Sequence, residues 1–237
     1  MYKRVLLKIS GETLKGGQDH GYDSEAVRRV VKLVKQAVDR GVEVALVVGA
    51  GNIWRGVMGA KGGMDAVTAD YMGMLGTVMN ALCLSDFFHA AGVGAEVHCS
   101  VAMEPFAKKF DRSAAISALE SGRIVIFAGG TGSPFFTTDT TAALRALELD
   151  CEAVLKATKV DGIYTADPFK DASATRFDFL TYDEALNRKL AVMDQAAFSL
   201  CRDHRLPIVV FNFFDDASLG RVLDGDLAAG TRVGLAE

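Results

Sequence analysis

The stretch Ala128 to Asp139 (AGGTGSPFFTTD) has the composition of a turn that binds an anion. Its glycines would let the backbone approach a ligand closely, because no Cβ stands in the way, and its threonines add hydroxyl groups. The β-branched run Arg123 to Phe127 precedes the turn, and apolar residues at helical spacing follow from Thr140. At a strand-to-helix junction the first helical turn leaves N–H groups unpaired, and these groups attract phosphate. The stretch therefore indicates a phosphate site, although an ordinary capped βα turn accounts for the same residues.

Two charged residues, Lys8 and Asp139, are further candidates for chemistry. Lys8 lies near the carboxyl end of a predicted strand, Tyr2 to Ser10. A lysine within a buried strand is costly unless a negative partner meets it, so its position favours a functional role. The alternative is an edge strand with Lys8 facing water. Asp139 offers a carboxylate that would cap the following helix or hold a metal ion.

A second glycine-rich turn, Gly49 to Gly56 (GAGNIWRG), follows the predicted strand Val42 to Val48. It resembles half of a dinucleotide-binding fingerprint. However, Trp54 stands where that fingerprint needs a small residue, and the turn follows the second strand instead of the first, which argues against such a site. Arg55 beside the turn would bind a phosphate through two parallel hydrogen bonds, or is an exposed loop arginine.

A long helix is predicted from about Asp65 to Ala91. Asp70 in its first turns either complements the helix dipole or faces whatever the GAGNIWRG turn binds. One apolar stripe of this helix indicates a core face or a subunit interface; it consists of Met72, Leu75, Met79, Leu82 and Cys83.

Composition limits the function classes. The chain has 237 residues, 50% of them hydrophobic, which is ample for a core, and we expect one domain over residues 1–237. A net charge of −4 argues against a nucleic-acid or anionic-membrane surface, so phosphate binding must be local. The four cysteines form no CxxC pair and the four histidines no HxxH or HExxH motif, which argues against zinc and suits buried, reduced thiols. No signal peptide or apolar run of membrane-spanning length is visible, so we expect a cytoplasmic protein.

Strands and helices alternate along the chain. Besides those named above, the predicted strands are Ala95–Ser100, Cys151–Ala157, Leu206–Asn212 and Gly230–Leu235, with Thr175–Leu180 pairing at an edge. The other predicted helices are one capped by Asp23 or Ser24 and ended by Gly41, one capped by Asp111 (Ser113–Glu120), and Asp183–Leu190, Met193–Arg205 and Ala217–Leu223. This alternation predicts an α/β sandwich with a mainly parallel sheet, and the loops after three of its strands should converge at one edge. P-loop and protein-kinase motifs are absent from the sequence, which excludes the common phosphoryl-transfer folds.

At this point the sequence resembles a known family, the bacterial-type UMP kinases of the amino acid kinase superfamily. The resemblance covers Tyr2 to about Asn212 and rests on LLKISGE, VVGAGNIWRG, MGMLGTVMNAL, AGGTGSPFFTTDTTAALRALE, KATKVDGIYTADP, VMDQAAFSL and DHRLPIVVFN. It implies a three-layer α/β/α fold, a homohexamer, and Mg²⁺-dependent transfer of the ATP γ-phosphate to UMP in pyrimidine nucleotide synthesis.

The resemblance also implies roles for individual residues. The residues implied for ATP are Lys8, Ser10, Gly11, Gly51, Arg55, Lys156, Thr158, Tyr164 and Asp167. Those implied for UMP are Ala50, Arg55, Asp70, Thr131, Gly132, Ser133, Pro134, Phe135, Phe136, Thr137 and Thr138, with Asp70 at the ribose hydroxyls. Lys8, Asp139 and Asp194 are the implied catalytic residues, and Mg²⁺ is held mainly by ATP phosphates or also by Asp139.

The chain departs from the family pattern at three positions. Ala50 replaces a glycine, Ser133 replaces an asparagine, and Glu96 stands where some members use an arginine for allosteric GTP, which argues against GTP activation. Two other functions compete: an amino-acid or carbamate kinase of the same fold, and a nucleotide sensor without turnover. Asp70 with PFFTTD argues against the first, and Lys8 with Asp139 against the second.

Overall fold

The computed structural model describes residues 1–55, 59, 62–190 and 192–235. In that part of the chain the strands are β1 (Arg4–Ile9), β2 (Glu43–Val48), β3 (Ala95–Cys99), β4 (Lys108–Lys109), β5 (Ile124–Ala128), β6 (Ala153–Thr158), β7 (Ile163–Tyr164), β8 (Arg176–Phe177), β9 (Phe179–Thr181), β10 (Ile208–Asn212) and β11 (Gly230–Gly234). The α-helices are α1 (Ser24–Asp39), α3 (Ala66–Ala90), α4 (Arg112–Glu120), α5 (Thr138–Glu148), α6 (Tyr182–Asn187), α7 (Gln195–Asp203) and α8 (Ser218–Leu223), and the short 3-10 helices are η1 (Gly11–Leu14) and η2 (Leu227–Ala229).

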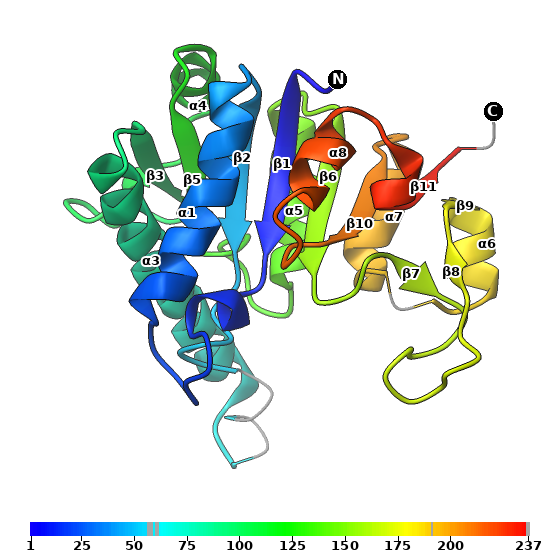
Figure 1. Ribbon diagram of the computed structural model, residues 1–237. Coiled ribbons are helices and arrows are strands. Elements are labelled where there is room, and N and C mark those ends of the chain that lie inside the picture. Colours follow the sequence, from blue (N-terminus) through cyan, green and yellow to red (C-terminus); the bar gives the residue numbers. More distant parts are fainter. Residues whose placement is uncertain (56–58, 60–61, 191, 236–237) are drawn as a thin grey trace.

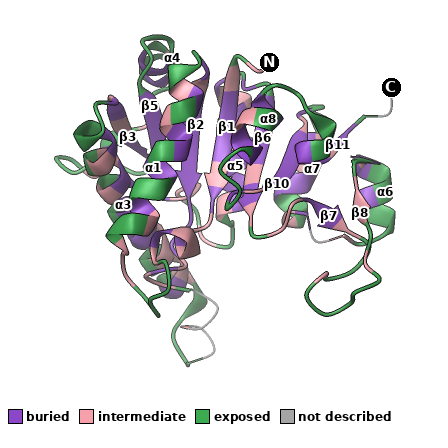
Figure 2. Cartoon of the chain, viewed as in Figure 1, coloured by how far each residue is buried: buried purple, intermediate pink, exposed green. Residues whose placement is uncertain are grey.

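One nine-stranded sheet runs through the molecule in the order β4-β3-β5-β2-β1-β6-β10-β11-β9. Its strands pair in parallel, except for the antiparallel pair β10 and β11. The central strands are nearly continuous apolar runs, as strands buried on both faces require. Figure 2 shows this buried centre between more exposed helices.

Helices cover both faces of the sheet. One core cluster joins alternate strand residues to α1, α3 and α8, and the other joins the remaining strand residues to α4, α5, α6 and α7. Because side chains of a strand alternate between faces, two separate cores mean two helical layers around one sheet. The predicted three-layer α/β/α fold is confirmed, and Figure 1 shows the arrangement.

β1 lies in the middle of the sheet. It pairs with β2 on one side and with β6 on the other, so the alternative of an edge strand for Lys8 is wrong. The strands β5, β2 and β1 are neighbours and run in the same direction, with Ile9 beside Val48 and Val47 beside Phe127. Their following loops therefore meet at the carboxyl edge of the sheet, as predicted.

Local signals located the helices well. Asp23 caps α1 by accepting from the amides of Glu25 and Ala26, and Asp111 caps α4 by accepting from the amide of Ala114. The predicted edge pairing of Thr175–Leu180 is confirmed by β9, which pairs with β11 at the end of the sheet. Sequence reasoning missed the edge strand β4 and the strand β7, which are two residues long and carry little periodicity. β8 lies within the predicted Thr175–Leu180 strand and pairs with β7 outside the main sheet.

Candidate active site

Lys8, Asp139 and Lys156 form one charged cluster at the carboxyl edge of the sheet. Lys8 and Lys156 are direct neighbours in the register of β1 and β6, so their side chains leave the sheet on the same face. Asp139 comes from the first turn of α5. Its Oδ1 lies 2.7 Å from Lys8 Nζ, and its Oδ2 accepts a hydrogen bond of 2.7 Å from Lys156 Nζ. The Lys8 side chain is only 14% exposed, so its carboxylate partner is what makes its position tolerable.

The cluster keeps its charges although it is largely buried. Burial raises the pKa of the Asp139 carboxyl, but the two lysines outweigh burial and hold this pKa below its usual value. Burial lowers the pKa of Lys156, and Asp139 opposes that effect only in part. With two ammonium groups and one carboxylate, the cluster has a net charge of +1, which suits an anionic ligand.

Asp139 does not cap α5, contrary to one of the two roles suggested by the sequence. The cap is Thr137, whose side chain accepts a hydrogen bond of 3.0 Å from the Asp139 amide. Asp194 caps α7 and also accepts from the hydroxyls of Thr137 and Thr140. Asp194 thus ties the start of α5 to the start of α7, while Asp139 turns inward to the lysines.

The first two loops at this edge touch each other. A Cβ at Gly11 would lie 2.4 Å from Gly49 O, so only glycine allows this approach. Ser10 accepts from the Glu12 amide and starts the short helix η1. Among the described residues, the amides of Ala50 and Gly51 in the second turn donate to no protein acceptor. Unpaired amides at the same edge of the sheet as the two lysines are a suitable place for phosphate oxygens.

A pocket of about 160 Å³ lies between α3 and the glycine turn after β5. Asp70 lies in this pocket, and its Oδ2 accepts a hydrogen bond of 2.8 Å from the Phe135 amide. The remaining lining consists of Ala50, Ala69, Gly73, Met74, Thr77, Gly130, Phe136, Thr137 and Thr138. A carboxylate, several hydroxyls and apolar walls together suit a nucleoside. Asp70 therefore does more than complement a helix dipole.

The turn Gly129 to Gly132 is held by its neighbours. The Gly129 amide donates to Thr77 Oγ1 at 2.8 Å, and the backbone here has a positive φ of 74°. Thr131 and Ser133 bond each other within the turn, and Pro134 and Phe135 follow. Among the described residues, the amides of Gly130 and Thr131 donate to no protein acceptor. These two amides form a second place for an anion, and Gly130 and Ala50 line the same pocket.

Arg55 lies beside these turns but faces a carboxylate here. Its Nη2 is 2.5 Å from Glu12 Oε1, and the side chain is 61% exposed. Burial raises the pKa of Glu12, but hydrogen bonds from Arg55 and Lys15 outweigh it and lower this pKa. The Arg55 side chain is thus open to solvent and would have to exchange Glu12 for a phosphate.

Three of the residues predicted for ATP lie at the end of β6 or after it. Thr158 ends β6 and donates to Val160 O at 2.6 Å, and the Tyr164 hydroxyl donates to Asp161 at 2.6 Å. Asp167 accepts from the Phe169 amide at 3.0 Å in an exposed turn. Thr158 ends β6 and the other two residues follow it in sequence, whereas Asp70 lies on α3, which packs against β2 and β5. The structure thus separates the two groups of predicted nucleotide residues with the lysine cluster between their strands.

Two residues that depart from the family pattern, Ala50 and Glu96, make specific contacts in the structure. The Ala50 methyl group packs against Gly76 of α3, where a Cβ would lie 2.9 Å from it, so this pair accommodates the larger residue. The Glu96 carboxylate contacts Arg123 and accepts from Lys108 at 2.7 Å. Both cations near Glu96 are therefore already paired.

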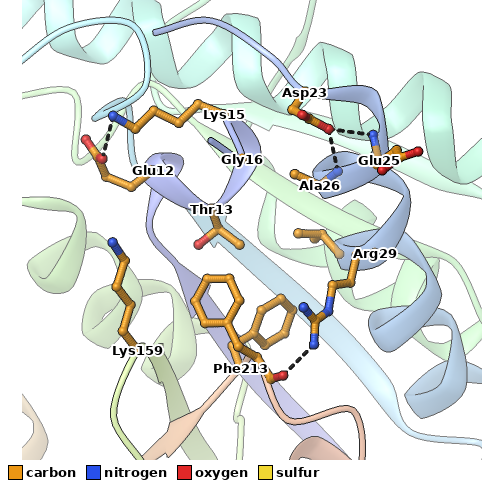
Figure 3. A pocket seen from close by; sticks show the side chains of 12 residues that line it. Glu12, Thr13, Lys15, Gly16, Asp23, Glu25, Ala26, Arg29, Lys159 and Phe213 are labelled. Carbon is orange, nitrogen blue, oxygen red and sulfur yellow. Dashed lines mark hydrogen bonds and ion pairs between the residues drawn. The ribbon is translucent and has the colours of Figure 1, made fainter. Parts of the chain in front are cut away.

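A larger pocket of about 630 Å³ lies beside the start of α1 (Figure 3). None of the candidate ATP, UMP or catalytic residues selected from the sequence lines it. Its charged lining is balanced, with three acids and three bases: Glu12, Asp23, Glu25, Lys15, Arg29 and Lys159. Lys15 lies 3.1 Å from Glu12, and Arg29 donates to Asp216 at 2.8 Å. This pocket is larger than the Asp70 pocket, but the unpaired amides suited to a phosphate lie at the smaller one.

Sequence reasoning missed two polar residues of α3, Thr77 and Asn80. Both are buried, and Asn80 donates to Gly49 O at 2.6 Å and to Asn52 Oδ1 at 2.7 Å. α3 thereby anchors both glycine turns. The signal was available, because Thr77 lies seven positions after Asp70 and so shares its helix face.

Comparison with known proteins places the fold. Residues 3–212 match the model of the amino acid kinase family. The chain belongs to the amino acid kinase family. A UMP kinase from Bacillus anthracis is 37% identical with a TM-score of 0.95, and the match covers 98% of this chain and 96% of that one. A UMP kinase from Ureaplasma parvum is 30% identical with a TM-score of 0.91 over 99% of both chains. A uridylate kinase from Archaeoglobus fulgidus is 26% identical with a TM-score of 0.75, over 99% of this chain and 100% of that one.

Two negative observations concern only the described residues. No group of three or more His, Cys, Asp or Glu side chains there lies close enough together to hold a metal ion. Every helix in the same ranges is too short or too polar to span a membrane.

Proposed function

We propose that this protein transfers the γ-phosphate of ATP to UMP and forms ADP and UDP. The observation that carries this proposal is the cluster of Lys8, Asp139 and Lys156 next to a pocket that contains the Asp70 carboxylate. The likeness to two UMP kinases at 37% and 30% identity over nearly the whole chain supports UMP as the acceptor.

The acceptor nucleotide would occupy the Asp70 pocket. Asp70 Oδ2 is bonded to Phe135, which leaves Oδ1 for the ribose hydroxyls. The hydroxyls of Thr137 and Thr138 lie in the same pocket. The open amides of Ala50 and Gly130, at the edge of this pocket, would receive the UMP phosphate.

The donor nucleotide would lie across β1 and β6. Its phosphates would meet Lys8, Ser10 and Gly11, and its base side would extend toward Thr158, Tyr164 and Asp167. In the reaction an oxygen of the UMP phosphate forms a bond to the γ-phosphorus while the bond to the ADP oxygen breaks. Little covalent chemistry is needed from the protein, because positioning and charge stabilisation carry phosphoryl transfer.

The lysine cluster lies where the two anions meet. Both substrates are negatively charged, and their repulsion must be offset at the reacting edge of a protein with net charge −4. Lys8 and Lys156 supply fixed cations, and Asp139 orients both. Since these groups are already ordered, they stabilise developing charge without reorganisation.

Mg²⁺ would enter with ATP. Both oxygens of Asp139 face ammonium groups, and Asp194 is occupied by two hydroxyls and an amide, so neither is an open ligand in this arrangement. The residues fit a Mg²⁺ ion that is held mainly by nucleotide phosphates. When bound, the ion neutralises phosphate charge.

We further propose a homohexamer in the cytoplasm. The exposed apolar face of α3 supports an oligomer, and the four cysteines are free thiols, as expected in a reducing compartment.

The test is ADP release with ATP and Mg²⁺ across UMP, CMP, dTMP, carbamate and aspartate. We expect turnover with UMP well above the others. Turnover with carbamate or aspartate in its place would favour an amino-acid-type kinase, and binding of UMP without any turnover would favour a sensor.

A further inference from the structure

Arg145 of α5 is a buried cation that the proposed reaction does not use. Its side chain is 6% exposed, pairs with Glu148 and stacks over the ring of Phe110 at 4.1 Å. Its Nε has no hydrogen-bond partner among the described residues. A buried arginine is costly, so its position calls for a physical explanation.

Arg145 bonds a serine that in turn bonds the glycine turn. Arg145 Nη2 donates to Ser100 Oγ at 3.0 Å, and Ser100 Oγ donates to Gly130 O at 2.5 Å. A guanidinium can only donate, and a hydroxyl has one hydrogen. Arg145 therefore occupies a lone pair of Ser100, and the Ser100 hydrogen is directed to the Gly130 carbonyl.

The Gly130 carbonyl belongs to the same planar peptide as the Thr131 amide. In a trans peptide the C=O and N–H bonds point in opposite directions, so fixing the carbonyl fixes the amide. Gly130 has a φ of 57°, and a glycine peptide without an anchor would turn easily. Gly130 lines the Asp70 pocket, and among the described residues the Thr131 amide donates to no acceptor.

We propose that Arg145, acting through Ser100, is a positioning residue that aims the Thr131 amide at the phosphate of the acceptor nucleotide. This inference rests on the proposed function, since it assigns the phosphate of a nucleoside monophosphate to this turn. It concerns the acceptor side only, so the donor side should not change when the relay is broken.

The test is Ser100→Ala in steady-state assays that vary UMP and ATP separately. Losing the bonds of one hydroxyl should raise the KM for UMP roughly 3- to 10-fold, with the KM for ATP unchanged. Arg145→Met should raise the KM for UMP by less, because Ser100 keeps its hydroxyl. Ser121→Ala is the matched control, since Ser121 also donates to a backbone carbonyl, Ala118 O at 2.7 Å, and lies at the end of α4.

The outcomes separate this inference from the proposed function. A wild-type protein that forms no UDP would remove the proposed function. A wild-type protein that forms UDP, with an unchanged KM for UMP in Ser100→Ala, would overturn the relay, and so would equal rises in both KM values. If Ser100→Ala does not fold by circular dichroism, the KM for UMP of Arg145→Met decides in the same way.

Discussion

Asp139 holds two ammonium groups that would otherwise repel each other. Lys8 and Lys156 are neighbours across β1 and β6, and Asp139 forms an ion pair with each at 2.7 Å. Loss of Lys8 leaves Asp139 paired with Lys156, so the cluster changes from a net charge of +1 to neutral and the fold should persist. Removal of Lys8 should therefore lower the rate of phosphoryl transfer and leave the stability of the fold largely unchanged.

Lys8→Ala should lower kcat on the order of 10²-fold or more, because it removes a cation needed more in the transition state than in the ground state. Initial rates at saturating ATP and UMP measure this, with circular dichroism to confirm folding. Lys3→Ala, at an exposed lysine of the same segment, is the control and should keep wild-type kcat. A folded Lys8→Ala protein with wild-type turnover rejects the role.

Asp70 should make the enzyme prefer a ribonucleotide. Hydrogen bonds to a charged group contribute roughly 1.5 to 3 kcal/mol, which predicts a preference for UMP over dUMP of about 10- to 150-fold in kcat/KM. Asp70→Ala should flatten this ratio, but it also removes the partner of the Phe135 amide. Asp70→Asn keeps a carbonyl for that amide and is the sharper variant.

The measurement is kcat/KM for UMP and dUMP with wild type, Asp70→Asn and Asp70→Ala. Asp65→Asn, at the cap of the same helix, serves as the control. If Asp70 only complemented the helix dipole, its variants would lose a little stability and keep the ratio, and that result would end the ribose assignment.

At the scale of elements, α3 joins the site to an open surface. Its buried face carries Thr77 and Asn80, which hold the two glycine turns. Its other face is apolar and exposed, with Tyr71, Met72, Leu75, Met79 and Leu82 each at least 37% exposed. Of the predicted stripe only Cys83 packs against the core, so the interpretation as a subunit interface remains for the other four residues.

Charges on this face should dissociate the oligomer. For the wild type we expect a closed oligomer, a hexamer. Leu75→Glu and Met79→Glu would each bury a carboxylate in an apolar contact, so we expect smaller species for both variants. Light scattering at micromolar concentration measures the mass. Leu227→Glu is matched in exposure, since Leu75, Met79 and Leu227 are each 52% exposed, and should leave the mass unchanged. A monomeric wild type would exclude the interface.

At the scale of the whole molecule, His98 links stability to pH. It lies fully buried in β3, with Phe110 and Phe127 around it and Glu96 3.4 Å away. Burial lowers the pKa of His98, and Glu96 opposes this only in part. In the unfolded chain a histidine takes up a proton below pH of about 6.5, while folded His98 stays neutral to a lower pH.

The unfolded state therefore binds more protons in that window, and stability should fall as pH drops from about 6.5 toward the lowered pKa of His98. One histidine can change the free energy of unfolding by at most about 1.4 kcal/mol per pH unit. The free energy of unfolding, measured with urea at several pH values in this range, should change less with pH for His98→Gln than for wild type. His20→Gln, in a surface loop, should keep the wild-type slope, and equal slopes for all three proteins would refute the link.

The sequence by itself determined most of the elements and the place of the site. Caps such as Asp23 and Asp111, β-branched runs and helical periodicity are local, so they can be read without the fold. Because parallel strands end at the same edge of a sheet, the loops that follow them meet there. This is why Lys8 and the two glycine turns were predicted to lie together. Only the tertiary structure decided what each side chain faces.

The register of β1 and β6 places Lys8 beside Lys156, and no local signal states a register between strands far apart in sequence. The same holds for Asp139, which a local pattern would assign to a helix cap and which the packing of α5 against β1 turns toward two lysines. It holds also for α3, whose periodicity shows an apolar stripe without saying that the polar side of Thr77 and Asn80 is the buried one. Contacts between distant segments set these choices, because burial and hydrogen bonding are satisfied only when the layers are assembled.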